Sequence, residues 1–337
     1  MYNPQVTIIL PTYNTRESIF KLLYGLLLQS YKKFNVIIVY KPWRGYKTVF
    51  ARISEYKGLD IDFVKQDEGF FEEALNTAYR KADGDVMIHT DDDALVSKDW
   101  IKNHVELHVK HEKIGMATGR VIEDIYPNGT SLPFFKKLIN DSKWRMNRHT
   151  IIDKPLDNKF KDYGMYVGNS GMLVDTGKKY GMIKTLKQHG VNMSWKYSAL
   201  SGFKLPGYTK NAGGNEAAAA LEVINRGYLP IWFDGAVVSH PAQESLLSRS
   251  ASVFELPQGL TEERVLFAYY TNMFSDYKID PGVLKFRTDI DAFISRFIAP
   301  KASKGYTIGY KLASKAIEGC WKPSAVRREL INNLKGE

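Results

Sequence analysis

The chain has a single cysteine, Cys320, among its 337 residues, so an intrachain disulfide is impossible. This suits a reducing compartment, and we expect a cytoplasmic location. The first ten residues, MYNPQVTIIL, lack the basic segment and long apolar core that are typical of a signal peptide. No apolar run reaches the length of a membrane span. We therefore expect neither a disulfide-stapled secreted protein nor an integral membrane protein.

The composition is that of a folded globular protein, with 44% hydrophobic and 13% aromatic residues. A chain of this length can hold one large domain or two. The net charge is +10, and from Pro281 onward eleven basic residues face five acidic ones, so most of the excess lies near one end. A basic tail favours anionic lipid, nucleic acid or a phosphorylated substrate, although a solvated helical surface gives the same pattern.

The first half of the sequence alternates between short apolar runs and segments of helical spacing. Strands are predicted at residues 6–10, 35–40, 61–64, 85–89 and 115–122. Helices are predicted at residues 14–29, 70–82 and 97–111, with Asn14 and Ser97 as N-caps. Strands and helices in alternation with short links predict an α/β fold, a mostly parallel sheet with helices on both faces.

The second half carries fewer clear signals, and residues 126–163 read as loop-rich. Another strand is expected at residues 166–175, a glycine turn followed by an alanine-rich helix at 211–228, and a late strand at 229–240. Beyond Pro241 the pattern is helical, with breaks at Pro281, Pro300 and Pro323. We predict one domain over residues 1–245, divided into two halves near residue 125, and a helical extension over 246–337.

Three adjacent acids, Asp91, Asp92 and Asp93, follow the strand at residues 85–89 directly. Ligands of open parallel sheets bind beyond the carboxyl ends of the strands, and PTYN at residues 11–14 should reach the same edge. Since Ser97 is expected to cap the next helix, the acids are surplus to the fold, and a functional role is favoured. Oxygen ligands of this kind suit Mg²⁺ or Mn²⁺.

Two further residues have a functional and an ordinary interpretation. His240 ends the late strand and is a plausible additional metal ligand, or else a hydrogen-bonded surface histidine. Glu216 follows Gly213 and Gly214 at the start of the alanine-rich helix. A carboxylate there is stabilised in its charged form, so it could act as a general base or serve only as a partner of the helix dipole. Local sequence leaves both pairs of alternatives open.

Three motifs in order resemble family 2 glycosyltransferases with the GT-A fold. ILPTYN resembles the first-strand signature, and ADGDVMIHTDDDALVSKDW resembles the strand that leads into the DxD motif. GGNEAAAALEVINRGYLPIWFDGAVVSH resembles the helix with the catalytic base, the Arg-x-Gly-Tyr turn and the late strand that ends in histidine. The resemblance covers roughly residues 6–240, and three ordered motifs are far more specific than one.

The resemblance implies an inverting transfer of a sugar from a nucleotide diphosphate sugar to an acceptor hydroxyl, with Mn²⁺ or Mg²⁺ as cofactor. Glu216 is the implied base, and the implied metal ligands are Asp91, Asp93 and His240. Implied donor contacts are Pro11, Thr12, Tyr13, Asn14, Asp67, Gly69, Asp91 and Asp92. The resemblance makes residues 1–245 a catalytic domain, with a donor half up to about 125 and an acceptor half from 126. Expected acceptor contacts are Gly171 and Trp195. The glycines and aromatics of the loop around Trp195, residues 191–208, suit a mobile wall over sugar rings, although a packed surface loop would show the same residues. Acceptors expected from the family are glycans and lipid-linked sugars.

The sequence departs from the family pattern at three places, and the first two leave the identity of the donor open. Where the family has acids after the second strand, this chain has VYKPWRG, so Lys41, Trp43 and Arg44 could meet the base or a phosphate instead. The family's Ala-Arg-Asn is replaced by residues 74–76, Ala-Leu-Asn. Its Gly-Glu-Asp is replaced by residues 214–216, Gly-Asn-Glu, which gives the base a longer side chain.

Other classes fit less well. A nucleotidyltransferase uses a similar sheet, but PTYNTRES lacks the glycine and lysine of a triphosphate loop. A metal-dependent nuclease needs further acids that are not evident. A nucleic-acid-binding protein could use the basic tail, but aromatic residues are not interleaved there at regular spacing. No nucleic acid partner is expected.

The tail also predicts contact with a membrane surface. Phe293, Ile294, Phe297 and Ile298 can share one helical face, and Leu312, Ala316 and Ile317 another, with basic residues between them. Such stripes lie well in the interface of an anionic membrane, which suggests a peripheral protein on the cytoplasmic face. Packing on the catalytic domain or dimerisation would use the same stripes.

Overall fold

The computed structural model describes residues 3–15, 17–123, 149–178, 181–210, 213–240 and 258–335. Two compact units divide the chain, and each collects segments that are far apart in sequence. Unit 1 consists of Met1–Ile125, Tyr180–Leu205 and Ala219–Ala242, and unit 2 of Tyr126–Lys179, Pro206–Ala218 and Gln243–Glu337. The predicted domain boundary near residue 245 and most of the predicted loop-rich segment lie outside the described residues, so that boundary stays a prediction.

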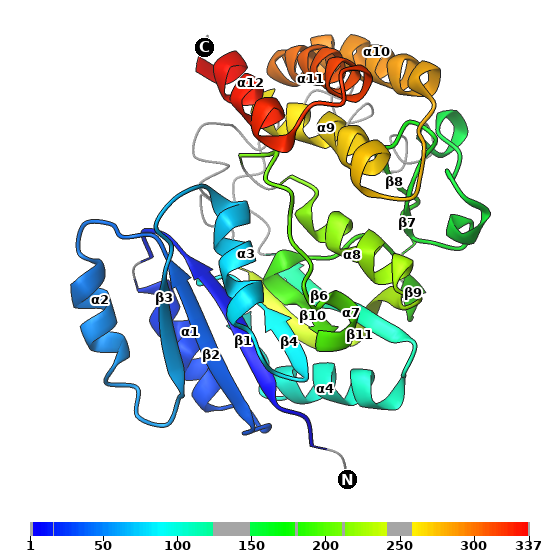
Figure 1. Cartoon of the computed structure of the whole chain (residues 1–337). Coiled ribbons are helices and arrows are strands. Elements are labelled where there is room, and N and C mark those ends of the chain that lie inside the picture. Colours follow the sequence, from blue (N-terminus) through cyan, green and yellow to red (C-terminus); the bar gives the residue numbers. More distant parts are fainter. Residues whose placement is uncertain are drawn as a thin grey trace. The chain divides into compact units, whose positions relative to one another are not determined.

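In its described part, unit 1 is built on a nine-stranded mixed sheet with the order β3-β2-β1-β4-β10-β6-β11-β5 and with β9 on β11 (Figure 1). The strands are β1 (Val6–Thr12), β2 (Phe34–Tyr40), β3 (Ile61–Lys65), β4 (Val86–His89), β5 (Leu95–Val96), β6 (Ile114–Glu123), β9 (Ile183–Lys184), β10 (Met193–Lys196) and β11 (Leu229–His240). The first four strands of that order are parallel, as are β6 and β11. Strands β5, β9 and β10 run antiparallel to their neighbours.

Helices cover both faces of this sheet. Those of unit 1 are α1 (Ser18–Leu27), α2 (Tyr46–Ile53), α3 (Phe71–Lys81), α4 (Trp100–Lys110) and the short α7 (Tyr197–Leu200), with a 3₁₀ turn η2 (Gly190–Asn192). Leu22 and Leu26 of α1 and Trp100 of α4 pack with Ile8 and Val36 of the sheet in one buried core. Helix α3 lies on the opposite face (Figure 1). The predicted fold class, a mostly parallel sheet between helices, is confirmed.

Both predicted helix N-caps are wrong. Helix α1 begins at Ser18 with Glu17 at the N-cap, while Asn14 adopts a left-handed backbone with φ 59°. Helix α4 begins at Trp100 with Asp99 at the N-cap, and Ser97 contributes only its carbonyl oxygen, which accepts the Trp100 N–H. For α4 the pattern misleads because residues 97–99 form a turn between β5 (Leu95–Val96) and the helix, so the helix starts three residues later than predicted.

Unit 2 combines a two-stranded hairpin with long helices. The predicted single strand at residues 166–175 is wrong, because β7 (Met165–Val167) and β8 (Leu173–Asp175) pair antiparallel around a turn in which Gly171 has φ 76°. The helices are α9 (Gln258–Phe274), α10 (Pro281–Ile298), α11 (Pro300–Glu318) and α12 (Pro323–Lys335), with the 3₁₀ turn η1 (Asn158–Phe160). Each predicted proline break is confirmed as the first residue of a helix, where its missing N–H costs no hydrogen bond.

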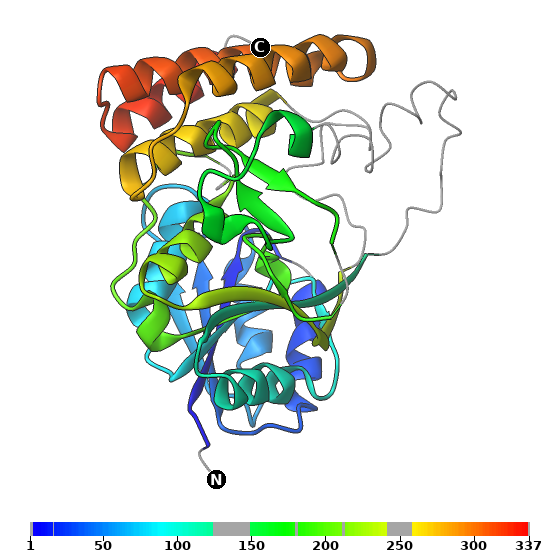
Figure 2. The same ribbon diagram turned by 90° about the vertical axis from the view of Figure 1, so that its right-hand side faces the viewer.

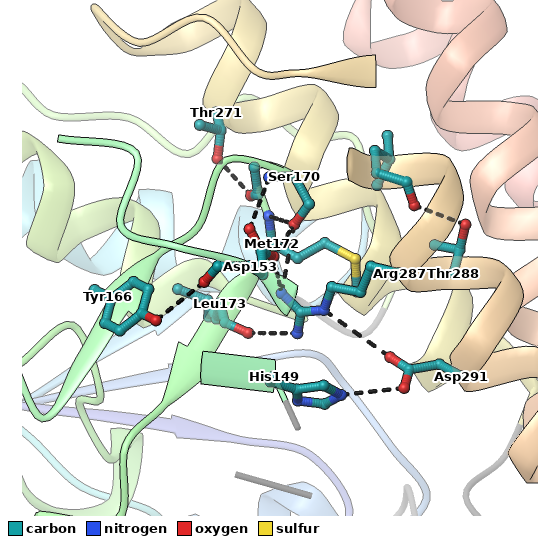
Figure 3. A network of polar contacts seen from close by, with 12 residues as sticks. His149, Asp153, Tyr166, Ser170, Met172, Leu173, Thr271, Arg287, Thr288 and Asp291 are labelled. Carbon is teal, nitrogen blue, oxygen red and sulfur yellow. Dashed lines mark hydrogen bonds and ion pairs between the residues drawn. The ribbon is translucent and has the colours of Figure 1, made fainter. Parts of the chain in front are cut away.

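A buried ionic network joins the hairpin to α10 (Figure 3). The Arg287 guanidinium donates to the Asp153 carboxylate and, at 2.8 Å, to the Leu173 carbonyl oxygen. Asp153 also accepts the backbone N–H of Ser170 at 3.0 Å, and the side chains of Asp153 and Arg287 are 0% and 4% exposed. A carboxylate of this kind is tolerated in the interior because each oxygen meets a donor.

Replacing Arg287 by methionine should lower the free energy of unfolding by about 3–5 kcal/mol, because the substitution leaves the Asp153 charge buried without its partner. Urea denaturation followed by circular dichroism measures this change. The matched control is Lys285→Met on the same helix, whose ion pair with Asp289 is 58% and 60% exposed and is screened by water. An equal loss in both variants would contradict a structural role for the buried pair.

Candidate metal and donor site

The acidic triplet forms a tight turn at the carboxyl end of β4. The strand ends at His89, and the next residue continues the parallel ladder, since the Thr90 N–H donates to the Ile9 carbonyl of β1 at 3.1 Å. The chain then turns back, and the Ala94 N–H donates to the Asp91 carbonyl at 3.2 Å. The ladder therefore fixes where the turn begins, and the turn returns the chain to the two-residue strand β5.

Strand register brings His240 to this turn. In the antiparallel pair of β5 and β11, Val96 lies opposite Val238 and Leu95 opposite Ser239, so His240 comes next to the acidic turn. Its Nε2 atom is 3.1 Å from Asp93 Oδ1 and 3.9 Å from Asp91 Oδ2. One ligand atom from each of the three side chains lies within 4.8 Å of the other two. The three predicted metal ligands are brought together, in a spacing that fits a divalent cation.

Asp92 is oriented differently from its two neighbours. One of its carboxylate oxygens accepts a short hydrogen bond from the Thr12 hydroxyl at the end of β1. Burial raises the pKa of Asp92 to about 6, and the Thr12 hydrogen bond opposes that rise. Asp92 thus ties the end of β1 to the acidic turn. Beyond Thr12, Tyr13 is 52% exposed at this edge, whereas Pro11 is buried inside β1.

The Asp91 carboxylate is partly exposed and has a raised pKa. Its side chain keeps 39% of its surface exposed, so a cation has access to it. Removal from bulk water, and then repulsion by Asp93, raise the pKa of Asp91 to about 6, against the attraction of His240. The two carboxylates repel each other when no cation lies between them, and a bound divalent ion would offset this repulsion.

Mn²⁺ affinity should fall steeply as the pH drops below about 6. A metal ligand must be deprotonated, and a raised carboxyl pKa means that protons begin to compete near pH 6 rather than near the ordinary aspartate value of 3.8. We expect a loss of about tenfold per pH unit or more below that point. Calorimetric titration of the protein with Mn²⁺ at pH 7, 6 and 5 measures it, and an affinity that stays constant over this range would contradict the cluster as the binding site.

The other predicted donor residues lie at the ends of the adjacent strands. Asp67 follows β3 and pairs with Lys65 at 2.9 Å on the surface. Gly69 has φ 90°, and its carbonyl oxygen accepts the Lys41 ammonium from the end of β2 at 3.1 Å. Lys41 is therefore held across the carboxyl edge, where family members place acids.

An aromatic cluster stands at the same edge of the sheet. The Trp43 ring lies 6.0 Å from that of Tyr46 and 5.7 Å from that of Phe50, and Tyr40 stacks on Tyr46 at 5.6 Å. Tyr40 is the last residue of β2, and the other rings follow on the loop and in α2. The segment VYKPWRG, which stands where acidic residues were expected, therefore contributes to packing, because its tryptophan contacts the helix that follows.

Glu216 lies in unit 2, in the first turn of α8 (Asn215–Asn225), and its backbone N–H donates to the Asn215 side chain at 2.9 Å. The turn before it is braced by Glu263 of α9, which is fully buried and accepts the N–H groups of Lys210 and Gly213, each at 2.9 Å. Sequence reasoning missed Glu263, since no local pattern marks a helical glutamate as a partner of a turn about fifty residues away.

The predicted mobile wall around Trp195 is wrong. Trp195 lies in β10, between β4 and β6 in the middle of the sheet, is 3% exposed, and packs against the Tyr79 ring at 5.3 Å. Gly171, the other predicted acceptor contact, lies in the β7–β8 turn, where a Cβ atom would come within 2.5 Å of Ile279 and where its carbonyl accepts the Thr271 hydroxyl. This close packing is sufficient to explain why residue 171 is a glycine, and no contact with a sugar acceptor is needed.

Solved structures share this fold. The mannosyltransferase PcManGT from Pyrobaculum calidifontis, in complex with GDP-Man and Mn²⁺, aligns with a TM-score of 0.54 at 19% identity, over 96% of this chain and 79% of that one. GalNAc-T7 with UDP, GalNAc and Mn²⁺ aligns with a TM-score of 0.53 at 13% identity, over 85% and 55%. S. aureus TarS 1-349 in complex with UDP-GlcNAc aligns with a TM-score of 0.50 at 12% identity, over 98% and 92%.

Sequence comparison identifies relatives over part of the chain. Glycosyltransferase AglE of Haloferax volcanii is 28% identical over 130 residues, which cover 37% of this chain and 42% of AglE. Uncharacterized glycosyltransferase YfnE of Bacillus subtilis is 26% identical over 117 residues, which cover 33% and 28%. The chain thus matches less than half the length of each curated relative. The model of "Glycosyl transferase family 2" matches residues 7–166, which include β1 and the acidic turn. The predicted resemblance to glycosyltransferases is confirmed, and over residues 7–166 it is a match to glycosyl transferase family 2.

Proposed function

We propose that this protein is a metal-dependent, inverting glycosyltransferase that uses a nucleotide diphosphate sugar. The observation that carries the proposal is the cluster of Asp91, Asp93 and His240, with ligand atoms within 4.8 Å of one another at the carboxyl edge of a family 2 sheet. Two of the similar structures contain Mn²⁺, and all three contain a nucleotide or nucleotide sugar.

The proposed metal ligands suit Mn²⁺ or Mg²⁺. Carboxylate oxygens fit both ions, and the imidazole nitrogen of His240 favours Mn²⁺ of the two. When bound, the cation supplies positive charge that stabilises the departing diphosphate. Asp91 and Asp93 would hold it, while Asp92, engaged with Thr12, keeps the turn in place.

The proposed transfer is a single displacement. The acceptor oxygen forms a bond to C1 of the sugar as the bond from C1 to the diphosphate oxygen breaks on the opposite side, so the anomeric configuration inverts. The carboxylate of Glu216 takes the proton of the attacking hydroxyl. Its place in the first turn of α8 favours the ionised form that a base requires.

Donor contacts are proposed along the carboxyl edge of the sheet. They come from Thr12 at the end of β1, from Tyr13 and Asn14 after it, and from Asp67 and Gly69 after β3. Tyr13 is exposed at this edge. Gly69 has a positive φ, and its carbonyl oxygen accepts a hydrogen bond from Lys41. An acceptor of the glycan or lipid-linked type stays a prediction from the family resemblance.

Release of nucleotide diphosphate from a donor panel tests this function. GDP-mannose, UDP-GlcNAc and UDP-GalNAc are incubated with the protein, with and without Mn²⁺, and with EDTA. We expect release from at least one donor with Mn²⁺ and none with EDTA. Undiminished release in EDTA would contradict metal dependence, and release of pyrophosphate from a nucleoside triphosphate would favour a nucleotidyltransferase.

A further inference from the structure

Helix α10 exposes a line of phenylalanines. Phe286, Phe293 and Phe297 are 57%, 58% and 66% exposed, and Ile290 between them is half-buried. Spacings of four, three and four residues place these side chains on one side of the helix, over about 16 Å of its length. The rings of Phe293 and Phe297 meet edge to face at 5.5 Å. We call these four residues the aromatic stripe.

The opposite side of α10 is the side that packs against the rest of unit 2. Leu284, Arg287 and Asp291 are buried there, and Arg287 makes the ionic network with the hairpin (Figure 3). Isolated exposed apolar residues are ordinary, but a contiguous row of aromatic side chains marks an interaction surface.

The structure corrects the sequence expectation about α11. Leu312 and Ala316 are 3% and 0% exposed and Ile317 is half-buried, so most of the second predicted membrane stripe is core. On α10, Phe293 and Phe297 are exposed as the membrane prediction requires, Ile294 is half-buried, and Phe286 and Ile290 extend the stripe by two turns. The side chain of Ile298 lies outside the described residues.

Helix α10 and its neighbour α11 together carry an excess of exposed positive charge. Helices α10 and α11 lie side by side (Figures 1 and 2), with the Ser303 hydroxyl donating to the Ala292 carbonyl at 2.7 Å and the Lys285 ammonium 5.9 Å from the Tyr310 ring. Among the described residues of the two helices, the exposed basic side chains are Lys285, Arg296, Lys301, Lys304, Lys311 and Lys315. The exposed acidic ones in the same set are Asp289 and Glu318, which leaves an excess of four positive charges.

We propose that this surface binds an anionic lipid membrane, with α10 lying in the interface and its aromatic stripe inserted between headgroups. Phenylalanine on one side of a helix and lysine or arginine beside it are the features of interfacial helices. A second copy of the chain fits less well, since a symmetric contact would bring two positive surfaces together. Among the described residues, no helix is both long and apolar enough to cross a bilayer, so the contact is peripheral.

Vesicle sedimentation of the full chain tests this inference without any activity measurement. We expect the protein to pellet with phosphatidylcholine vesicles that contain about 30% phosphatidylglycerol, and to stay largely in the supernatant with phosphatidylcholine alone. The double variant Phe293→Ser/Phe297→Ser should bind at least about tenfold more weakly, and so should Lys301→Glu/Lys304→Glu. About 0.5 M NaCl should weaken binding of the unaltered protein.

Matched controls replace residues of the same kind outside α10 and α11. Ile151, which is 70% exposed, is replaced by serine, and the exposed Lys161 by glutamate, and both should bind like the unaltered protein. Unchanged melting temperatures show that the variants fold. The inference is overturned if the unaltered protein stays in the supernatant with anionic vesicles, or if the stripe variants bind as well as the controls. A dimer in analytical ultracentrifugation that the stripe variants dissociate would assign the surface to a second copy instead.

Discussion

Sugar transfer by the Asp93→Asn protein should fall below detection while the protein stays folded. Asn keeps the shape of the side chain but removes the charge of the ligand that is 3.1 Å from His240. The two carboxylates of Asp91 and Asp93 provide the negative charge that holds the divalent cation, and the substitution removes about half of it. Without the bound cation, the departing diphosphate lacks the positive charge that stabilises it. Rates of nucleotide diphosphate release and calorimetric Mn²⁺ binding should decline together.

The fold should tolerate this change because like charges in the turn repel one another when no cation is bound. The melting temperature of the cation-free protein should stay the same or rise slightly. Asp83→Asn is the matched control, since Asp83 is an exposed aspartate at the other end of β4. Full activity of the Asp93→Asn protein, or full activity of the unaltered protein in EDTA, would rule out the metal role.

Glu216→Gln should lower turnover by about 100-fold or more and leave the donor affinity nearly unchanged. Glutamine keeps the size of the side chain and the helix propensity, but its amide cannot accept a proton at neutral pH. Because the donor is expected to bind through other residues, the change affects the chemical step. Steady-state kinetics with separate variation of donor and acceptor measures the two effects.

Glu222→Gln on the same helix is the control, since Glu222 pairs with Arg226 at 2.7 Å and is not expected to touch the substrates. It should keep most of the turnover. Proton NMR of the product from the unaltered protein tests the stereochemistry, and retention of the anomeric configuration would contradict a single displacement with Glu216 as base. A Glu216→Gln protein that turns over like the Glu222→Gln protein would do the same.

Local pattern predicted β1, β2, β3 and β4 within one or two residues. Three of them, β1, β2 and β4, are short apolar runs that the parallel sheet buries, and the edge strand β3 is half-buried. The failures share one cause. Strand β10 was taken for a loop, since MSWK is four residues long and contains serine and lysine. Its place between β4 and β6 comes from pairing with chain about 75 to 110 residues away. Periodicity within a short window carries no information about such partners.

The same distinction holds for the site. The order of the motifs predicted that the acidic triplet and His240 would lie at the same edge of one sheet, because the carboxyl ends of parallel strands share an edge. Their separation was decided by a two-residue antiparallel strand, β5, whose register with β11 sets His240 beside the acidic turn.

The sequence by itself determined the class of fold, the position of the acidic triplet after a strand and the family resemblance, since these depend on residue types at short spacing. Only the tertiary structure decided which residues are buried. Trp195, predicted to form a mobile wall, is buried in the sheet, and Glu263 accepts a hydrogen bond from the turn before Glu216. Phe286, Phe293 and Phe297 of α10 are exposed, whereas Leu312 and Ala316 of α11 are buried. Burial is a property of packing between elements far apart in the chain, and hydrophobicity in one helix cannot say which of its faces will find a partner.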